Sequence, residues 1–222
     1  MSLQHYHKRP RLRLMLLGEG ECGKGTFCEH LEQHYAISSM STSLMASTLF
    51  MYDKLKDKYG YKTPKECHAD RRNHRQEWYE GIYEFNTPEL TNLVRRIYQR
   101  YDTCDGVRHA EEFGAVKAKN MFDLSIWLDA GDRTEGEDSS SISVTRDMAD
   151  VILDNSTTQE DFIRRIDRFM ITMGFTKFGV YKGYTLIPDD SDQVLIAKHA
   201  KLIDVGRNIK EAEAIIDAKV AA

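Results

Sequence analysis

The stretch Gly18 to Thr26 holds the residues of this 222-residue sequence whose types and spacing most directly indicate chemistry. Gly18, four residues, Gly23 and Lys24 match the pattern G-x-x-x-x-G-K of a phosphate-binding loop. Glycine has no Cβ, so the backbone can curl until successive N–H groups point at phosphate oxygens, and Lys24 adds a mobile charge for the β- and γ-phosphates. We therefore expect the whole loop to bind a nucleotide: Gly18, Glu19, Gly20, Glu21, Cys22, Gly23, Lys24, Gly25 and Thr26.

The residues on either side of the loop fit its structural requirements. The apolar run Leu14 to Leu17 predicts a buried parallel strand that leads into the loop, and residues 25 to about 35 predict a helix whose positive N-terminus faces the same anion. The hydroxyl expected directly after the lysine comes one residue later, at Thr26, because Gly25 intervenes. This G-K-G-T form is typical of nucleotide kinases of the adenylate-kinase type. Thr26 is a candidate metal ligand.

A second group of candidates follows the strand end predicted at residues 103–107. Asp105 lies at the carboxyl end of that strand, so we expect it to face the phosphate loop. Its carboxylate could hold the water shell of Mg²⁺ or accept a proton from an attacking hydroxyl. A turn-forming aspartate before Gly106 is the alternative. Arg108 is expected to reach an acceptor phosphate, since an arginine at a helix start is poorly placed against the helix dipole.

A polar segment at residues 132–146, rich in acids, serines and glycine, predicts a lid. Arg133 opens this segment and would swing onto the transferring phosphate when the lid closes. A solvated loop arginine is the alternative interpretation. Arg146 is a second, weaker candidate.

Residues 66–85 predict one long helix on which Arg71, Arg75 and Trp78 recur at i, i+4 and i+7 and so share a face. Two guanidinium groups and an indole on one face can bind a phosphate and stack a base. The alternative is a core tryptophan with arginines that extend around it to solvent.

Strands that alternate with helices predict a three-layer α/β sandwich with a parallel sheet in the order 2-3-1-4-5. We expect strands at residues 14–17, 35–38, 103–107, 122–129 and 149–154, with a helical insertion at about 41–101. Residues 1–173 are expected to form this domain. Residues 174–222 predict an appendage made of a hairpin at 175–187 and helices at 189–199 and 208–219.

The composition describes a globular chain with 41% hydrophobic and 30% charged residues and a net charge of −4. This net charge argues against generic coating of nucleic acid, although residues 1–13 carry Lys8, Arg9, Arg11 and Arg13 without an acid. The four cysteines show no zinc or C-x-x-C spacing, which favours reduced thiols in the cytoplasm. No apolar run approaches the length of a membrane span, so no membrane partner is expected.

Taken together, these motifs resemble the deoxynucleoside-monophosphate kinases of bacteriophages, within the P-loop nucleotide kinases. The likeness covers about residues 12–170 and rests on the phosphate loop and five further stretches: Ser39 to Ser41, Arg71 to Trp78, Asp105 to Glu111, Ile126 to Arg133 and Ala149 to Asn155. It implies ATP as donor and Mg²⁺ as metal, with a monophosphate held between the insertion and Arg108. It also implies Ser39, Ser41, Arg71, Arg75 and Trp78 as substrate residues, and Lys24, Asp105 and Arg133 as catalytic ones. If the chain is phage-encoded, its location is the cytoplasm of the infected cell.

Two other functions stay open from the sequence. Similar phage kinases phosphorylate the hydroxymethyl group of 5-hydroxymethyluracil in DNA, and the basic N-terminal arm with the Lys/Arg-rich run from Lys54 to Arg75 would suit such an acceptor. A switch module that binds a nucleoside triphosphate without a small-molecule acceptor is the third interpretation, which an arginine-bearing insertion argues against. The oligomeric state is left open, a homodimer included.

Overall fold

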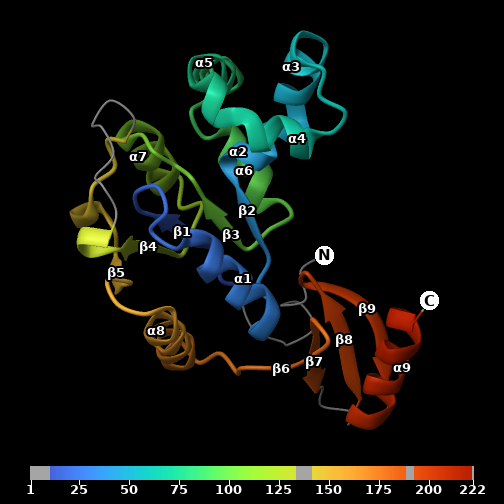
Figure 1. Cartoon of the computed structure of the whole chain (residues 1–222). Coiled ribbons are helices and arrows are strands. Elements are labelled where there is room, and N and C mark those ends of the chain that lie inside the picture. Colours follow the sequence, from blue (N-terminus) through green and yellow to red (C-terminus); the bar gives the residue numbers. More distant parts are fainter. Residues whose placement is uncertain (1–10, 134–141, 189–192, 222) are drawn as a thin grey trace.

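A five-stranded parallel sheet forms the centre of the computed structural model, which describes residues 11–133, 142–188 and 193–221 (Figure 1). Its strands are β1 (Leu14–Leu17), β2 (Ser39–Ser41), β3 (Thr103–Asp105), β4 (Leu124–Asp129) and β5 (Val151–Asp154). They pair in the order β2-β3-β1-β4-β5, every pair parallel. The predicted order 2-3-1-4-5 is confirmed.

Both faces of the sheet are buried, which explains why β1 is apolar at every position. Leu14 and Leu16 point into a core shared with α1 (Lys24–His34) and α8 (Gln159–Thr172). Met15 and Leu17 point into a second core with α7 (Ala110–Ala118) and the helices of the insertion. The result is the expected three-layer sandwich.

The insertion between β2 and β3 is helical throughout, as expected. It consists of α2 (Thr42–Ala46), a π-helical turn (Ser47–Met51), α3 (Tyr52–Tyr59), α4 (Pro64–Ala69), a 3₁₀ turn (Asp70–His74), α5 (Arg75–Phe85) and α6 (Asn92–Tyr98). Side chains define two of its helix starts, because the Ser41 hydroxyl accepts from the N–H of Leu44 and the Thr63 hydroxyl accepts from the N–H of Glu66.

The long helix predicted over residues 66–85 is wrong, because the chain changes to a 3₁₀ turn between α4 and α5. Asp70 explains the break. Its carboxylate accepts hydrogen bonds from Asn73 and Tyr61 and lies 3.1 Å from His74, so local side-chain bonds compete with the α-helical ladder.

The second strand lies at Ser39–Ser41 and not at residues 35–38. Ser38, the last residue of the expected strand, is bonded to the side chain of the fully buried Asp102. Its carboxylate accepts from both the N–H and the hydroxyl of Ser38, at 3.0 and 2.7 Å.

Residues 179–221 form a second unit with its own antiparallel sheet. Its strands β6 (Gly179–Tyr181), β7 (Tyr184–Pro188), β8 (Val194–Lys198) and β9 (Lys201–Gly206) pair in sequence order, and α9 (Ile209–Ala221) covers one face. The hairpin and the last helix are confirmed, whereas the helix expected over 189–199 is wrong. Val194 and Ile196 pack toward α9 while Leu195 and Ala197 pack on the other face, so this short apolar run is a strand buried on both sides.

The second unit joins the first through α1. The Thr185 hydroxyl donates to the carbonyl of Gln33 at 2.6 Å. Within the first unit and the segment that leaves it, Asp167 of α8 accepts from Tyr35 and from Lys177 and lies 2.7 Å from the Nε2 of His30. Among the described residues, no helix has the length and apolar character needed to cross a membrane.

Candidate functional site

The phosphate loop leaves β1 at Leu17 and enters α1 at Lys24. Gly18 and Gly23 have φ values of 132° and 101°, in the region that favours glycine. A Cβ on Gly23 would lie 2.3 Å from the Nδ2 of Asn155, and one on Gly18 would lie 2.9 Å from the carbonyl oxygen of Leu128. Both glycines are therefore required by close packing against the ends of β4 and β5.

Asn155 holds the loop in place, a role that was not assigned to it from the sequence. Its side-chain amide donates to the carbonyl of Cys22 at 2.9 Å. The residue is buried directly after β5, so it fixes the loop from the end of a strand that lies two places from β1 in the sheet. A single asparagine carries no local pattern that would identify this contact.

Lys24 folds back over the loop, where its Nζ donates to the carbonyls of Gly18 and Glu19 at 2.8 and 2.5 Å. The N-cap of α1 is Gly23, which provides no side chain to cap the first N–H groups. These donors, the left-handed backbone of Glu21 (φ 62°) and the mobile ammonium group together fit a polyphosphate.

Asp105 lies beside the loop as predicted, because strand register aligns it with Leu16 of β1 and Ser41 of β2. Burial raises the pKa of the Asp105 carboxyl above its ordinary value, and the positive charges of Lys24 and Arg71 act in the opposite direction. Arg108 lowers this pKa as well, although less than the other two cations. The charges of three predicted cations therefore act on one predicted carboxylate.

The positive charges of Arg71 and Arg108 also repel each other. Burial, together with the charges of Arg72 and Arg108, lowers the pKa of Arg71. The guanidinium of Arg71 donates to the carbonyl of His68 at 3.0 Å, which orients it from α4. Two guanidinium groups that repel each other beside a buried carboxylate form a place where an added anion is favourable.

His68, which lies in the same region, was not predicted from the sequence. Its Nε2 lies 2.9 Å from the hydroxyl of Ser43, and that hydroxyl lies 3.4 Å from the hydroxyl of Ser41. Burial and the charge of Arg71 lower the pKa of His68 to about 4, so its imidazole is neutral at physiological pH. A neutral polar group next to Arg71 suits an acceptor with one anionic and one uncharged end.

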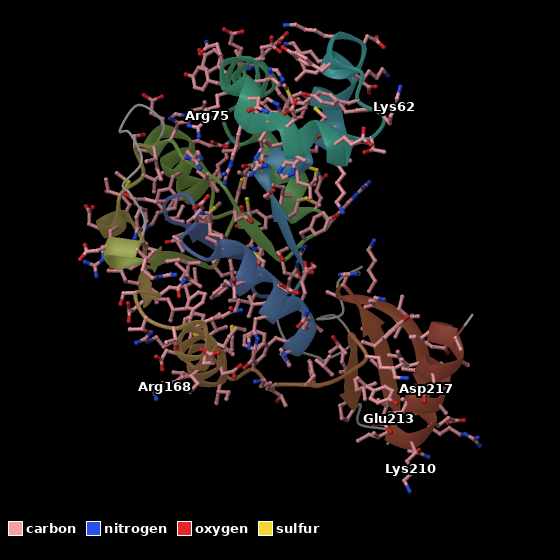
Figure 2. The ribbon with its side chains drawn as sticks, viewed as in Figure 1. Lys62, Arg75, Arg168, Lys210, Glu213 and Asp217 are labelled. Atoms are coloured by element: carbon pink, nitrogen blue, oxygen red, sulfur yellow. The ribbon has the colours of Figure 1, made fainter. Side chains whose placement is uncertain are left out.

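The three residues expected on one helix face are not brought together. Trp78 is 5% exposed, belongs to the core under the insertion and meets His68 edge-on, with ring centroids 6.4 Å apart. It supports His68 and presents no free face to a base. Arg75 is exposed on α5, and Figure 2 shows it on the side of that helix toward α7.

Exposed aromatic rings lie elsewhere on α5. Tyr79 and Tyr83 are exposed and stacked, with ring centroids 6.3 Å apart, and the ring of His109 meets Tyr79 edge-on at 5.8 Å.

An ion pair between Arg72 and Glu21, 3.3 Å long, joins the insertion to the phosphate loop.

The lid prediction lies largely outside the described residues, because 134–141 are not among them. At the two ends of this segment, Arg133 donates from Nε to the carbonyl of Asn155 at 2.8 Å, and Arg146 pairs with Asp129 at 3.1 Å. Asp129 and Arg146 line a small hollow beside Glu19 of the phosphate loop. The N–H and the hydroxyl of Ser39 are bound to Glu32.

The described part of the basic N-terminal arm serves the fold. Arg11 pairs with the buried Asp102 at 2.7 Å and Arg13 pairs with Asp123 at 2.8 Å. Both arginines precede β1, so they lie at the amino-terminal ends of the parallel strands, whereas the phosphate loop lies at the carboxyl ends. Lys8 and Arg9 lie outside the described residues.

Comparisons with known proteins give only distant structural likenesses. No protein-family model matches the sequence, and no curated protein sequence matches it. Among solved structures, an unliganded sugar kinase from Janibacter sp. HTCC2649 is 11% identical, with a TM-score of 0.40 over 74% of this chain and 95% of that one. A gluconokinase from Sinorhizobium meliloti 1021 is also 11% identical, with a TM-score of 0.40 over 75% of this chain and 98% of that one. The strand order, with the phosphate loop directly after β1, is that of the P-loop kinase fold.

Proposed function

We propose that the protein is a phosphotransferase that moves the γ-phosphate of ATP to a deoxynucleoside monophosphate. The observation that carries this proposal is the phosphate loop that leads into α1, with Asp105 at the end of the neighbouring strand β3, where the charges of Lys24, Arg71 and Arg108 act on its carboxyl group. Phosphoryl transfer requires positioned reactants and neutralised charge more than covalent participation, and these residues supply both.

On the donor side, the loop amides and Lys24 bind the β- and γ-phosphates and stabilise the charge that grows on their oxygens. Among the described residues, no three His, Cys, Asp or Glu side chains converge into a metal site. Thr26 and Asp105 would hold Mg²⁺ together with phosphate oxygens and water, which is its usual ligand set. When bound, Mg²⁺ neutralises charge on the transferring phosphate.

On the acceptor side, Arg71 and Arg108 bind the monophosphate and place its oxygen in line with the donor. The uncharged Ser43 and His68 hydrogen-bond to the nucleoside. The charges of cations on both sides act on Asp105, and its carboxylate would hold the water shell of Mg²⁺ between donor and acceptor.

The test offers γ-³²P-labelled ATP with a panel of deoxynucleoside monophosphates in one reaction and 5-hydroxymethyluracil-containing DNA in another. Label in a mononucleotide supports the proposal. Arg71→Gln should raise the KM for the mononucleotide by roughly 10-fold or more, as expected for the loss of one charged hydrogen-bonding partner. Arg100→Gln, at an exposed arginine remote from the loop, is the matched control and should leave both KM values unchanged.

The DNA acceptor remains a second candidate because of one observation. Exposed Tyr79 and Tyr83 beside Arg75 resemble the stacking surfaces that bind unpaired bases. Arg11, by contrast, is committed to Asp102 at the far edge of the sheet and cannot line a groove with the site. Label in the DNA and none in the mononucleotides would favour this candidate. Hydrolysis of ATP without label in either acceptor would instead indicate the switch module.

A further inference from the structure

The outer edge of the second sheet carries a row of apolar side chains. β9 pairs only with β8 among the described strands and lies on the side of this sheet away from the central sheet (Figure 1). Leu202, Ile203 and Val205 are 38%, 44% and 38% exposed. A six-residue edge strand with exposed apolar residues is a template for pairing with another strand.

A β-bulge gives this edge an unusual charge pattern. Ile196 pairs with Asp204 but the next residue, Ala197, pairs with Leu202, so Ile203 is the extra residue. Because of this bulge, Lys201 and Asp204, which are three residues apart, lie on the same face of the sheet. Asp204 pairs with Lys219 of α9. Lys201 lies opposite Lys198, whose ammonium sits 4.6 Å over the Tyr184 ring on the α9 face.

We propose that β9 pairs antiparallel with β9 of a second copy of this chain. The register that places Lys201 opposite Asp204 of the other copy also places Asp204 opposite Lys201, by the two-fold symmetry of such a contact. Leu202 then lies opposite Ile203, again twice. Lysine on an edge strand normally opposes pairing, but here each lysine meets a carboxylate on the same face.

Other registers are less favourable. Pairing centred on Asp204 places two carboxylates opposite each other, and like charges directly opposite destabilise a sheet. A register one residue from the proposed one, with Ile203 opposite Ile203, places Leu202 opposite Asp204 and leaves Lys201 opposite Val205. Charge therefore favours the proposed register over these two, and in it the two four-stranded sheets become a continuous eight-stranded sheet. This pairing is independent of the activity proposed above.

The experiment measures the mass of the full chain by sedimentation velocity and light scattering over a wide concentration range. We expect a reversible dimer for the wild type. Lys201→Asp and Asp204→Lys should each weaken it by about tenfold or more, since each replaces two attractive pairs by two repulsive ones. The double variant K201D/D204K exchanges the charges and should restore the dimer. Lys210→Asp on α9, at the position labelled in Figure 2, makes the same charge change away from the edge and is the control.

Each outcome decides for or against the proposal. A wild type that stays monomeric at the highest concentration overturns it. So does a dimer that both single variants leave intact, since the copies then meet through another surface. Loss of the dimer in the single variants without recovery in the double variant overturns the proposed register. Ile203→Lys places a charge in the apolar part of the contact and should also give a monomer, and circular dichroism of every variant verifies that the fold is retained.

Discussion

Replacement of Glu112 by glutamine should remove a pH dependence of stability that the structure locates in one carboxyl group. Glu112 lies in the first turn of α7, and its one polar contact with the described residues is the side-chain amide of Asn86, 3.4 Å from its Oε1. Burial raises its pKa from 4.5 to about 7, and the amide of Asn86 offsets this only partly. The folded protein therefore holds a proton on Glu112 that the unfolded chain releases at lower pH.

The sign and size of the effect follow by linkage. Between pH 4.5 and about 7 the folded state binds more protons than the unfolded state, so stability falls as pH rises through this window and levels off above it. At about 1.4 kcal/mol per pH unit, the loss reaches roughly 3 kcal/mol. A glutamine side chain cannot ionise. The Glu112→Gln variant should match the wild type near pH 5 and exceed its stability near pH 8 by up to about 3 kcal/mol.

Urea denaturation of the two proteins across this pH range measures the effect, because other titrating groups cancel in the difference. Glu111→Gln is the matched control, since Glu111 is the exposed neighbour on the same helix turn. A stability difference between wild type and Glu112→Gln that does not change with pH would refute the reasoning.

Four further outcomes are expected. Lys24→Ala should lower kcat by ~10²–10³ without change in the fold, measured by steady-state kinetics and circular dichroism; near-normal turnover would contradict the role of Lys24. His68→Ala should raise the KM for the mononucleotide and leave that for ATP unchanged, so an equal change in both would place His68 outside the acceptor site. Gly23→Ala should weaken nucleotide binding measured by calorimetry, because its Cβ would collide with Asn155; unaltered affinity would show that the loop tolerates the shift. Asp102→Ala should destabilise the fold by about 3–5 kcal/mol in urea, since it leaves Arg11 unpaired, and a loss below about 1 kcal/mol would count against that ion pair.

The features predicted correctly from the sequence depend on local signals. The phosphate loop is a continuous pattern whose glycines are required by the backbone itself, as the φ values of Gly18 and Gly23 show. The strand order follows from the alternation of strands and helices together with the position of that loop. Asp105 was placed correctly because the carboxyl ends of parallel strands meet at one edge of the sheet.

The features that were missed depend on contacts between distant parts of the chain. Whether Val194 to Lys198 is a strand or a helix is not decided by a short apolar run, and burial on two faces decided it. Helical periodicity placed Arg71 and Trp78 on one face of a single helix, but the 3₁₀ turn that Asp70 stabilises interrupts that helix. His68 became recognisable only through its contact with Ser43 in three dimensions.

The ion pair between Arg72 and Glu21 couples ligand binding at the phosphate loop to ligand binding at the insertion. It spans from the insertion, which we propose binds the acceptor, to the phosphate loop. Both side chains are exposed, so the pair is weak and easily altered by the charge of a ligand. A ligand that changes the strength of this pair on one side changes the affinity on the other side. Linkage then requires the reverse effect to be equal, so the donor and the acceptor would each alter the other's dissociation constant by the same factor.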